Sequence, residues 1–91
     1  SQVLANLLPG LEIDRTLLTE TGDLAPSRLF GCDFAGYWLE IGFGAGEHLA
    51  AQMERYPERG FIGAEPFVNG VAAFLKAIRE RPAVNVRVLM D

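Results

Sequence analysis

One stretch decides the fold of this chain: Tyr37-Trp38-Leu39-Glu40-Ile41-Gly42-Phe43-Gly44-Ala45-Gly46-Glu47. An apolar run with an acid near its end, followed by glycine at every second position, predicts a strand, a tight turn and the start of a helix. Glycine adopts positive φ without strain and lets a ligand approach the backbone closely. The helix that follows directs its free N–H groups at that ligand. The stretch therefore predicts a loop that holds a nucleotide-like cofactor.

The spacing of the glycines distinguishes two classes of cofactor. Loops that bind dinucleotides follow G-x-G-x-x-G and hold a pyrophosphate. Here Gly42, Gly44 and Gly46 follow G-x-G-x-G, and Glu40 stands two residues before the first of them. A carboxylate at that position repels a phosphate group and attracts the amino group of a cationic cofactor. The pattern favours S-adenosyl-L-methionine over NAD.

A second acid follows at a suitable interval. Residues 61–65 read Phe-Ile-Gly-Ala-Glu, a short buried strand with a carboxylate at its C-terminal end, and Glu65 lies 19 residues after Gly46. In nucleotide-binding βαβ units an acid about 20 residues beyond the glycine motif reaches the ribose hydroxyls. Because the carboxyl ends of parallel strands share one edge of a sheet, we expect Glu40, Glu65 and the glycines to line one crevice.

From Trp38 to Met90 the chain resembles the bacterial tRNA (guanine-N7-)-methyltransferases, a family of class I methyltransferases. The shared motifs are the Leu-Glu-Ile-Gly-Phe-Gly-x-Gly-Glu loop at 39–47, the Phe-Ile-Gly-x-Glu strand at 61–65 and the Gly-Val pair at 70–71. The resemblance implies transfer of a methyl group from S-adenosyl-L-methionine to N7 of a guanine in tRNA. It implies that the cofactor contacts are Glu40, Gly42, Phe43, Gly44, Gly46 and Glu65, with Asp91 near the position of a further acid of the family.

The resemblance also says what this chain lacks. The family carries an Asp-Pro-Trp-Pro-Lys-Lys-type segment and its guanosine and tRNA contacts after the third strand, and these 91 residues hold none of that. We therefore expect the N-terminal part of a longer enzyme, inactive by itself and without a catalytic residue of its own. Guanine N7 has a lone pair and no proton, so it attacks a sulfonium methyl group without a general base, and catalysis is mostly positioning.

Composition narrows the class of protein further. With 49% hydrophobic and 22% charged residues the chain is typical of a folded domain. No apolar run approaches the roughly 20 residues of a membrane span, and no signal peptide opens the sequence. The single Cys32 allows neither an internal disulfide nor a cysteine metal motif, so we expect a cytoplasmic protein without a metal. The net charge of −4 argues against a nucleic-acid surface here, so tRNA binding is expected from the missing C-terminal part.

Residue patterns divide the chain into an extension, 1–36, and the first half of a cofactor-binding domain, 37–91. In the extension, residues 1–8 have helical character that Pro9-Gly10 should stop, and the remainder reads as irregular chain packed on the first strand. Beyond it we predict strands at 37–41, 61–64 and 84–90 and helices at 47–56 and 68–81, the second ending just before Pro82. The second helix carries the clearest apolar stripe: Val68, Val71, Ala72, Leu75 and Ile78.

Strands that alternate with helices predict an α/β fold. Joined by right-handed crossovers, the three strands form the first parallel βαβαβ half of a Rossmann-like class I methyltransferase, in the order 3-2-1. The first strand is apolar at nearly every position, which is typical of a parallel strand covered on both faces. Its far edge lacks a neighbour in this half-sheet, and an open edge favours self-association of the isolated chain.

Simpler roles remain open for the same residues. Glu40 could cap N–H groups of the glycine loop, and Glu65 could be a strand-end turn residue or a charge at a helix N-terminus. Glu47 suits the positive end of the first helix, and His48 has no partner at metal-ligand or triad spacing. Three other functions stay possible: methylation of another substrate, an NAD-dependent oxidoreductase, and a non-catalytic module formed by the isolated fragment.

Overall fold

The structure, a computed structural model, describes residues 2–13, 27–80 and 85–91. Two helices precede the sheet, α1 (Gln2–Leu11) and α3 (Ser27–Phe30). Strands and helices then alternate in the order β1 (Gly36–Ile41), α4 (Glu47–Arg55), β2 (Arg59–Ala64), α5 (Val68–Ile78) and β3 (Val86–Leu89). The prediction of an α/β chain with strands that alternate with helices is confirmed. Part of the predicted third strand, at 84, lies outside the described residues.

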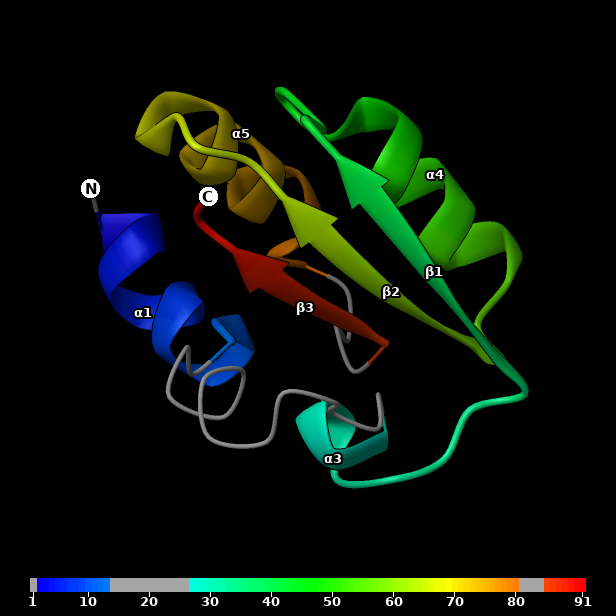
Figure 1. Ribbon diagram of the computed structural model, residues 1–91. Coiled ribbons are helices and arrows are strands. Elements are labelled where there is room, and N and C mark those ends of the chain that lie inside the picture. Colours follow the sequence, from blue (N-terminus) through cyan, green and yellow to red (C-terminus); the bar gives the residue numbers. More distant parts are fainter. Residues whose placement is uncertain (1, 14–26, 81–84) are drawn as a thin grey trace.

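The three strands form one parallel sheet. β2 is central, with β1 on one side, where Trp38 pairs with Phe61, and β3 on the other, where Phe61 pairs with Val86. All three arrows point the same way in Figure 1, so their carboxyl ends meet at one edge of the sheet. The loops that follow β1 and β2 therefore lie side by side, which is where a ligand site is expected in a parallel α/β sheet.

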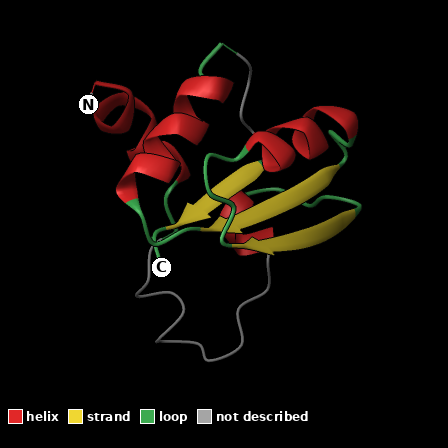
Figure 2. Cartoon of the chain, turned by 90° about the horizontal axis from the view of Figure 1, so that it is seen from above, coloured by secondary structure: helices red, strands yellow, loops and turns green. Residues whose placement is uncertain are grey.

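Helices α4 and α5 cover one face of the sheet, as the view in Figure 2 shows. Parallel pairing needs crossover connections, and both helices are such crossovers. The core between the layers consists of buried apolar side chains from both helices and from β2 and β3: Leu49, Met53, Phe61, Val71, Phe74, Leu75, Ile78, Val86 and Val88. This core holds the two crossovers, and with them the loops at their N-terminal ends, against the sheet.

The apolar stripe of α5 differs from the predicted one at its start. Val68 is exposed, whereas Phe74 is completely buried and contacts Phe43 with a ring-centroid distance of 5.1 Å. The buried face consists of residues 71, 74, 75 and 78, which is the i, i+3, i+4, i+7 pattern of one helix side. Val68 is the first residue of α5, and its side chain does not belong to the core.

The N-terminal helix corrects a prediction. α1 runs from Gln2 to Leu11 without stopping at Pro9, and the Glu12 N–H donates to the Leu8 carbonyl at 2.7 Å. Proline removes one donor from a helix interior. Here packing of α1 against α5 and β3 keeps the helix continuous. After α1 the chain runs beside β3, where the Ile13 N–H donates to the Val88 carbonyl at 2.8 Å. This part of the extension thus packs on β3 and α5 and not on the first strand.

Helix α3 lies against β3 and close to the start of β1. The Arg87 Nε–H donates to the Leu29 carbonyl at 2.9 Å, and the Arg87 guanidinium lies 4.9 Å from the centre of the Phe30 ring. Burial lowers the pKa of this guanidinium, and Cys32 opposes that shift. Phe30 and Phe34 also contact Tyr37 of β1. Phe30 and Phe34 of the extension therefore do pack on the first strand, whereas residues 14–26 lie outside the described part.

Strand β1 is much more open than predicted. Leu39 is 62% exposed and Ile41 76% exposed, and Trp38 is also exposed. We expected this strand to be covered on both faces. Among the described residues this is wrong, because no helix or strand that they form covers Leu39 and Ile41. Within the described part of the chain, β1 is also an edge strand without a neighbour on its outer side.

Candidate cofactor site

The glycine loop connects β1 to α4 at the carboxyl edge of the sheet. Gly42, Gly44 and Gly46 have φ angles of 70°, 61° and 79°. Among the described residues only glycines adopt positive φ, which residues with a Cβ disfavour. The Gly42 N–H donates to the Ala64 carbonyl at 2.6 Å and the Gly46 N–H to the Phe43 carbonyl at 2.9 Å. The sequence pattern thus predicted the residues that the turn requires.

The three glycines do not serve the same purpose. A Cβ added at Gly42 or Gly44 would meet no described atom within 4 Å, so both backbone positions face open space. A Cβ at Gly46 would overlap the Phe74 ring. Gly46 therefore lets the start of α4 pack on α5, whereas Gly42 and Gly44 leave the backbone accessible to a ligand.

Helix α4 begins directly behind this open backbone. Gly46 is its N-cap, and no side chain among the described residues forms a cap hydrogen bond there. The first N–H groups of a helix have no partner within the helix, and they carry partial positive charge. Glu47 lies exposed in the first turn, where a carboxylate is favourable. The loop and this helix end together offer backbone donors to a polar ligand.

Glu65 lies next to the loop, at the end of β2. Glu65 is only 4% exposed. The Gly44 N–H donates to its Oε1 at 2.7 Å, and the Phe67 N–H donates to its Oε2 at 3.2 Å. Each carboxylate oxygen has two lone pairs, so both retain a further acceptor position. The structure therefore brings Glu65 and the predicted glycine loop together, with the carboxylate bound to the loop backbone.

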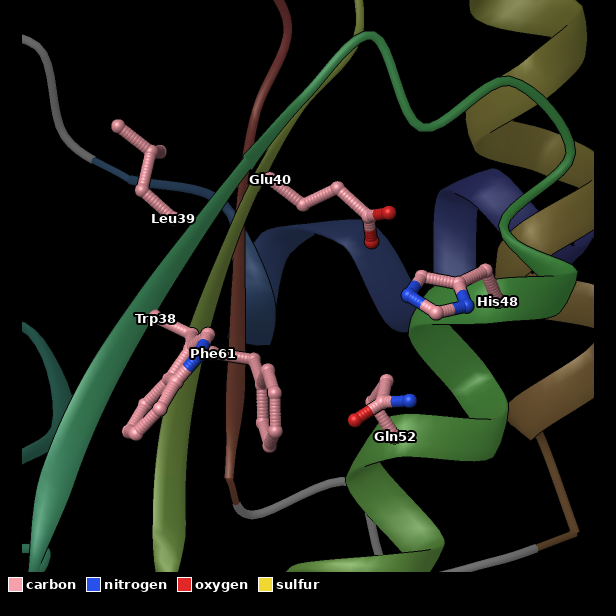
Figure 3. A pocket seen from close by; sticks show the side chains of 6 residues that line it. All are labelled: Trp38, Leu39, Glu40, His48, Gln52 and Phe61. Carbon is pink, nitrogen blue, oxygen red and sulfur yellow. The ribbon is translucent and has the colours of Figure 1, made fainter.

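Glu40 lies elsewhere. It pairs in register with Gly63, and its side chain extends from β1 toward His48 on α4 (Figure 3). There it lines a cavity of about 250 Å³ between the sheet and α4, together with Trp38, Leu39, His48, Gln52 and Phe61. The two acids thus occupy different places: Glu65 is bound to the glycine loop, and Glu40 lies on the helix-covered face of the sheet.

Two further predicted contacts are placed as follows. The Phe43 ring packs on Phe74, and a Cβ at Gly63 would come within 2.8 Å of it. Phe43 is thus part of the packing beneath the loop. Asp91 follows β3 at the same carboxyl edge of the sheet, is exposed, and donates its N–H to the Leu89 carbonyl at 3.0 Å.

Two residues near the loop escaped the sequence reasoning as site residues. Gly70 lies in the first turn of α5, where a Cβ would overlap the Gly44 carbonyl oxygen. Phe67 precedes α5 and is 72% exposed beside the buried Glu65. A glycine inside a helix was the available signal for Gly70, because alanine is the better helix former unless space is lacking. For Phe67 the sequence holds no comparable signal.

Within residues 2–13, 27–80 and 85–91, no group of three or more His, Cys, Asp and Glu side chains is placed to hold a metal ion. No helix in the same ranges is both long enough and apolar enough to cross a membrane.

Comparison with known proteins identifies relatives of this chain. It is similar to the tRNA (guanine-N(7)-)-methyltransferase of Agrobacterium fabrum, with 47% identity over 88 residues that cover 97% of this chain and 37% of that protein. The enzyme of the same name from Paracoccus denitrificans is 46% identical over 89 residues, again 97% of this chain and 37% of the relative. The chain therefore spans little more than a third of the length of these relatives. The resemblance predicted from residues 38–90 is confirmed.

A solved structure shares the fold. Phosphoethanolamine N-methyltransferase 2 of Haemonchus contortus, solved in complex with S-adenosyl-L-methionine, superposes with a TM-score of 0.53 at 22% identity, over 71% of this chain and 15% of that one. Residues 35–91, which contain the sheet, the glycine loop and Glu65, match the model of a family described as "Putative methyltransferase". The chain belongs to this methyltransferase family.

Proposed function

We propose that this chain is the cofactor-binding part of an S-adenosyl-L-methionine-dependent tRNA (guanine-N7-)-methyltransferase. One observation carries the proposal: three glycines with positive φ follow β1 directly and leave open backbone at Gly42 and Gly44 beside the carboxylate of Glu65. Family membership and the names of the relatives support the activity and the substrate. A cytoplasmic location follows from that activity.

The residues present fit the proposed cofactor. S-adenosyl-L-methionine supplies an electrophilic methyl group on a sulfonium. Gly42 and Gly44 leave room for close approach to the backbone, and Glu65 retains acceptor positions for ribose hydroxyls while it binds the Gly44 N–H. Glu40 precedes Gly42 by two residues and Asp91 follows β3 at the same carboxyl edge of the sheet, and the negative charge of both favours a cationic ligand.

In this proposal the chain contributes binding and orientation. Guanine N7 carries a lone pair and no proton, so the reaction needs no general base from these residues. Positioning of the two reactants in line accounts for the rate. The net charge of −4 is unsuited to binding a polyanion, so the tRNA contacts belong to the part of the relatives that this chain does not span.

The sheet in this proposal is half of a larger one. In a complete class I methyltransferase the order 3-2-1 continues beyond the first strand, and the open side of β1 is where a fourth strand would pair. Without that strand, unpaired N–H and C=O groups and the exposed Leu39 and Ile41 favour association of the isolated 91-residue chain with itself.

Calorimetric titration of the full-length protein with S-adenosylhomocysteine, using NADH as the control ligand, tests the cofactor. We expect binding of S-adenosylhomocysteine alone, because the loop lacks the dinucleotide spacing. Binding of NADH alone would contradict the proposal. In a second step, incubation with S-adenosyl-L-methionine and unmodified tRNA should produce 7-methylguanine, detected by mass spectrometry of the digested tRNA. Methylation of protein or small molecules in place of tRNA would reassign the substrate.

The role of Glu65 has its own test. Glu65→Ala in the full-length protein should weaken S-adenosylhomocysteine binding about tenfold or more, because charge-assisted hydrogen bonds are lost. Glu58→Ala is the matched control. Glu58 is exposed directly before β2, at the opposite end of the strand from Glu65, and its Oε1 lies 3.9 Å from Arg59 Nε. Equal affinities for the Glu65→Ala variant and the wild type would remove Glu65 from the site.

A further inference from the structure

The peptide at Gly44 is constrained from two sides. Its N–H donates to Glu65 Oε1 at 2.7 Å, a charge-assisted hydrogen bond to a buried carboxylate. Its carbonyl oxygen lies so close to Gly70 that a Cβ there would overlap it. Glu65 lies at the end of β2 and Gly70 in the first turn of α5. Two residues more than 20 positions from Gly44 in the sequence thus contact it.

Gly70 is a glycine for reasons of space and not of backbone conformation. It is not among the positive-φ glycines of the described residues, so an alanine would adopt its backbone angles without strain. Inside a helix alanine is a better helix former than glycine. A Cβ at this position would also lie 3.3 Å from Glu65 Cγ. The added methyl group would therefore crowd both the Gly44 carbonyl and the side chain of Glu65.

We propose that Gly70 is a positioning residue for the cofactor loop. Together with Glu65 it forms a clamp, the Gly44 clamp, that holds the loop in its open-backbone conformation before the cofactor arrives. The proposal deepens the function proposed above and rests on it for the identity of the ligand. The clamp itself follows from the distances to Gly44 and is independent of which ligand binds.

The clamp links cofactor binding to the position of α5. Gly44 has φ 61°, and its accessible backbone depends on the direction in which its peptide groups point. The Gly44 carbonyl belongs to the peptide group after the residue and the Gly44 N–H to the peptide group before it. In the proposed clamp, an added Cβ at Gly70 displaces the carbonyl together with the Gly44 Cα, so that the N–H moves away from Glu65 and the loop changes shape. A substitution at Gly70 should thus weaken ligand binding although this residue need not touch the ligand.

The test compares two glycine-to-alanine variants of the full-length protein. Gly70→Ala should weaken S-adenosylhomocysteine binding about tenfold or more, since overpacking a tight contact displaces the backbone. Gly10→Ala is the matched control, because a Cβ at Gly10 meets no described atom within 4 Å, and its affinity should stay at the wild-type value. A Gly70→Ala variant with wild-type affinity would overturn the proposal.

A second measurement needs no ligand. Glycine-selective 15N labelling and two-dimensional NMR of the ligand-free protein report on the loop amides directly. In both Gly70→Ala and Glu65→Gln the Gly44 amide resonance should move, while that of the remote Gly31 stays in place. If it moves in Glu65→Gln and not in Gly70→Ala, Gly70 is only a helix residue and the proposal is wrong.

The two measurements separate the proposals. If the wild-type protein binds no S-adenosylhomocysteine, the proposed function fails, whereas the NMR comparison still decides whether the Gly44 clamp exists. If Gly70→Ala does not fold, an unmoved Gly44 resonance in Glu65→Gln overturns the clamp, and a shifted one together with a folded Gly10→Ala variant supports it.

Discussion

The two edge strands of the sheet, β1 and β3, are both rich in apolar residues, but they differ in how far those residues are exposed to solvent. In β3, Val86 and Val88 are completely buried, and Glu12 and Ile13 run beside the strand, with Glu12 bridged to Val88. In β1, Leu39 and Ile41 are 62% and 76% exposed. The apolar character of a strand therefore does not by itself determine its burial. Burial depends on which other elements pack against the strand. Helices α1 and α3 contact β3, and its Val86 and Val88 lie in the core, whereas β1 faces open space within the described residues.

The largest effect is expected on the covered side of the sheet. Phe74→Ala removes a completely buried ring that packs on Phe43 and lies against Gly46. We expect a loss of roughly 3–5 kcal/mol in the free energy of unfolding, because truncation of a buried phenylalanine leaves a cavity. Denaturant unfolding measures it. Phe67→Ala, at a 72% exposed ring, is the control. Similar losses in both variants would contradict the assignment of Phe74 to the core.

A smaller effect is expected at the start of β3. The Asn85 side-chain amide is buried and donates to the carbonyls of Met53 at 3.2 Å and Arg59 at 3.2 Å. Asn85→Ala should cost about 1–3 kcal/mol, because the substitution leaves buried carbonyl groups without a donor. The same unfolding measurement tests this. Asn69→Ala, at an exposed position, provides the comparison. A neutral Asn85→Ala variant would mean that water replaces the lost donor.

The smallest effect on stability is expected at the open edge. In the isolated 91-residue chain, Ile41→Lys should change the free energy of unfolding by no more than about 0.5 kcal/mol, since Ile41 is 76% exposed there. The same substitution should shift the isolated 91-residue chain toward the monomer, because a charged residue on an edge strand opposes pairing with a second chain. Analytical ultracentrifugation of both chains at several concentrations measures this. A wild-type chain that is monomeric throughout would refute the predicted self-association.

Local patterns predicted most of the elements. The stripe at Leu49 and Met53 placed α4 correctly, and α5 begins at the predicted residue but ends at Ile78, earlier than predicted. Such patterns depend only on residues a few positions apart. The helix break at Pro9 was predicted on the same basis and was wrong. The difference is tertiary: α1 packs on α5 and β3, and no local pattern at Pro9 encodes that contact.

The candidate site shows the same division. Gly42, Gly44 and Gly46 were assigned from their spacing, because the turn needs positive φ whatever surrounds it. The partner of Glu65 could not be assigned this way, since Gly44 lies 21 residues away in the chain and meets it only across neighbouring strands. Placement of Glu40 beside His48, on the helix-covered face, likewise depends on where α4 packs.

By itself the sequence determined the alternation of strands and helices, the glycine turn after the first strand and the resemblance to methyltransferases. Each of these depends on backbone conformations and side-chain periods that act over a few residues. Only the tertiary structure decided that β1 stays open while β3 is covered, that Glu65 holds Gly44, and that Gly70 has no room for a Cβ. These contacts join residues far apart in the chain, and packing of the layers alone brings them within reach of one another.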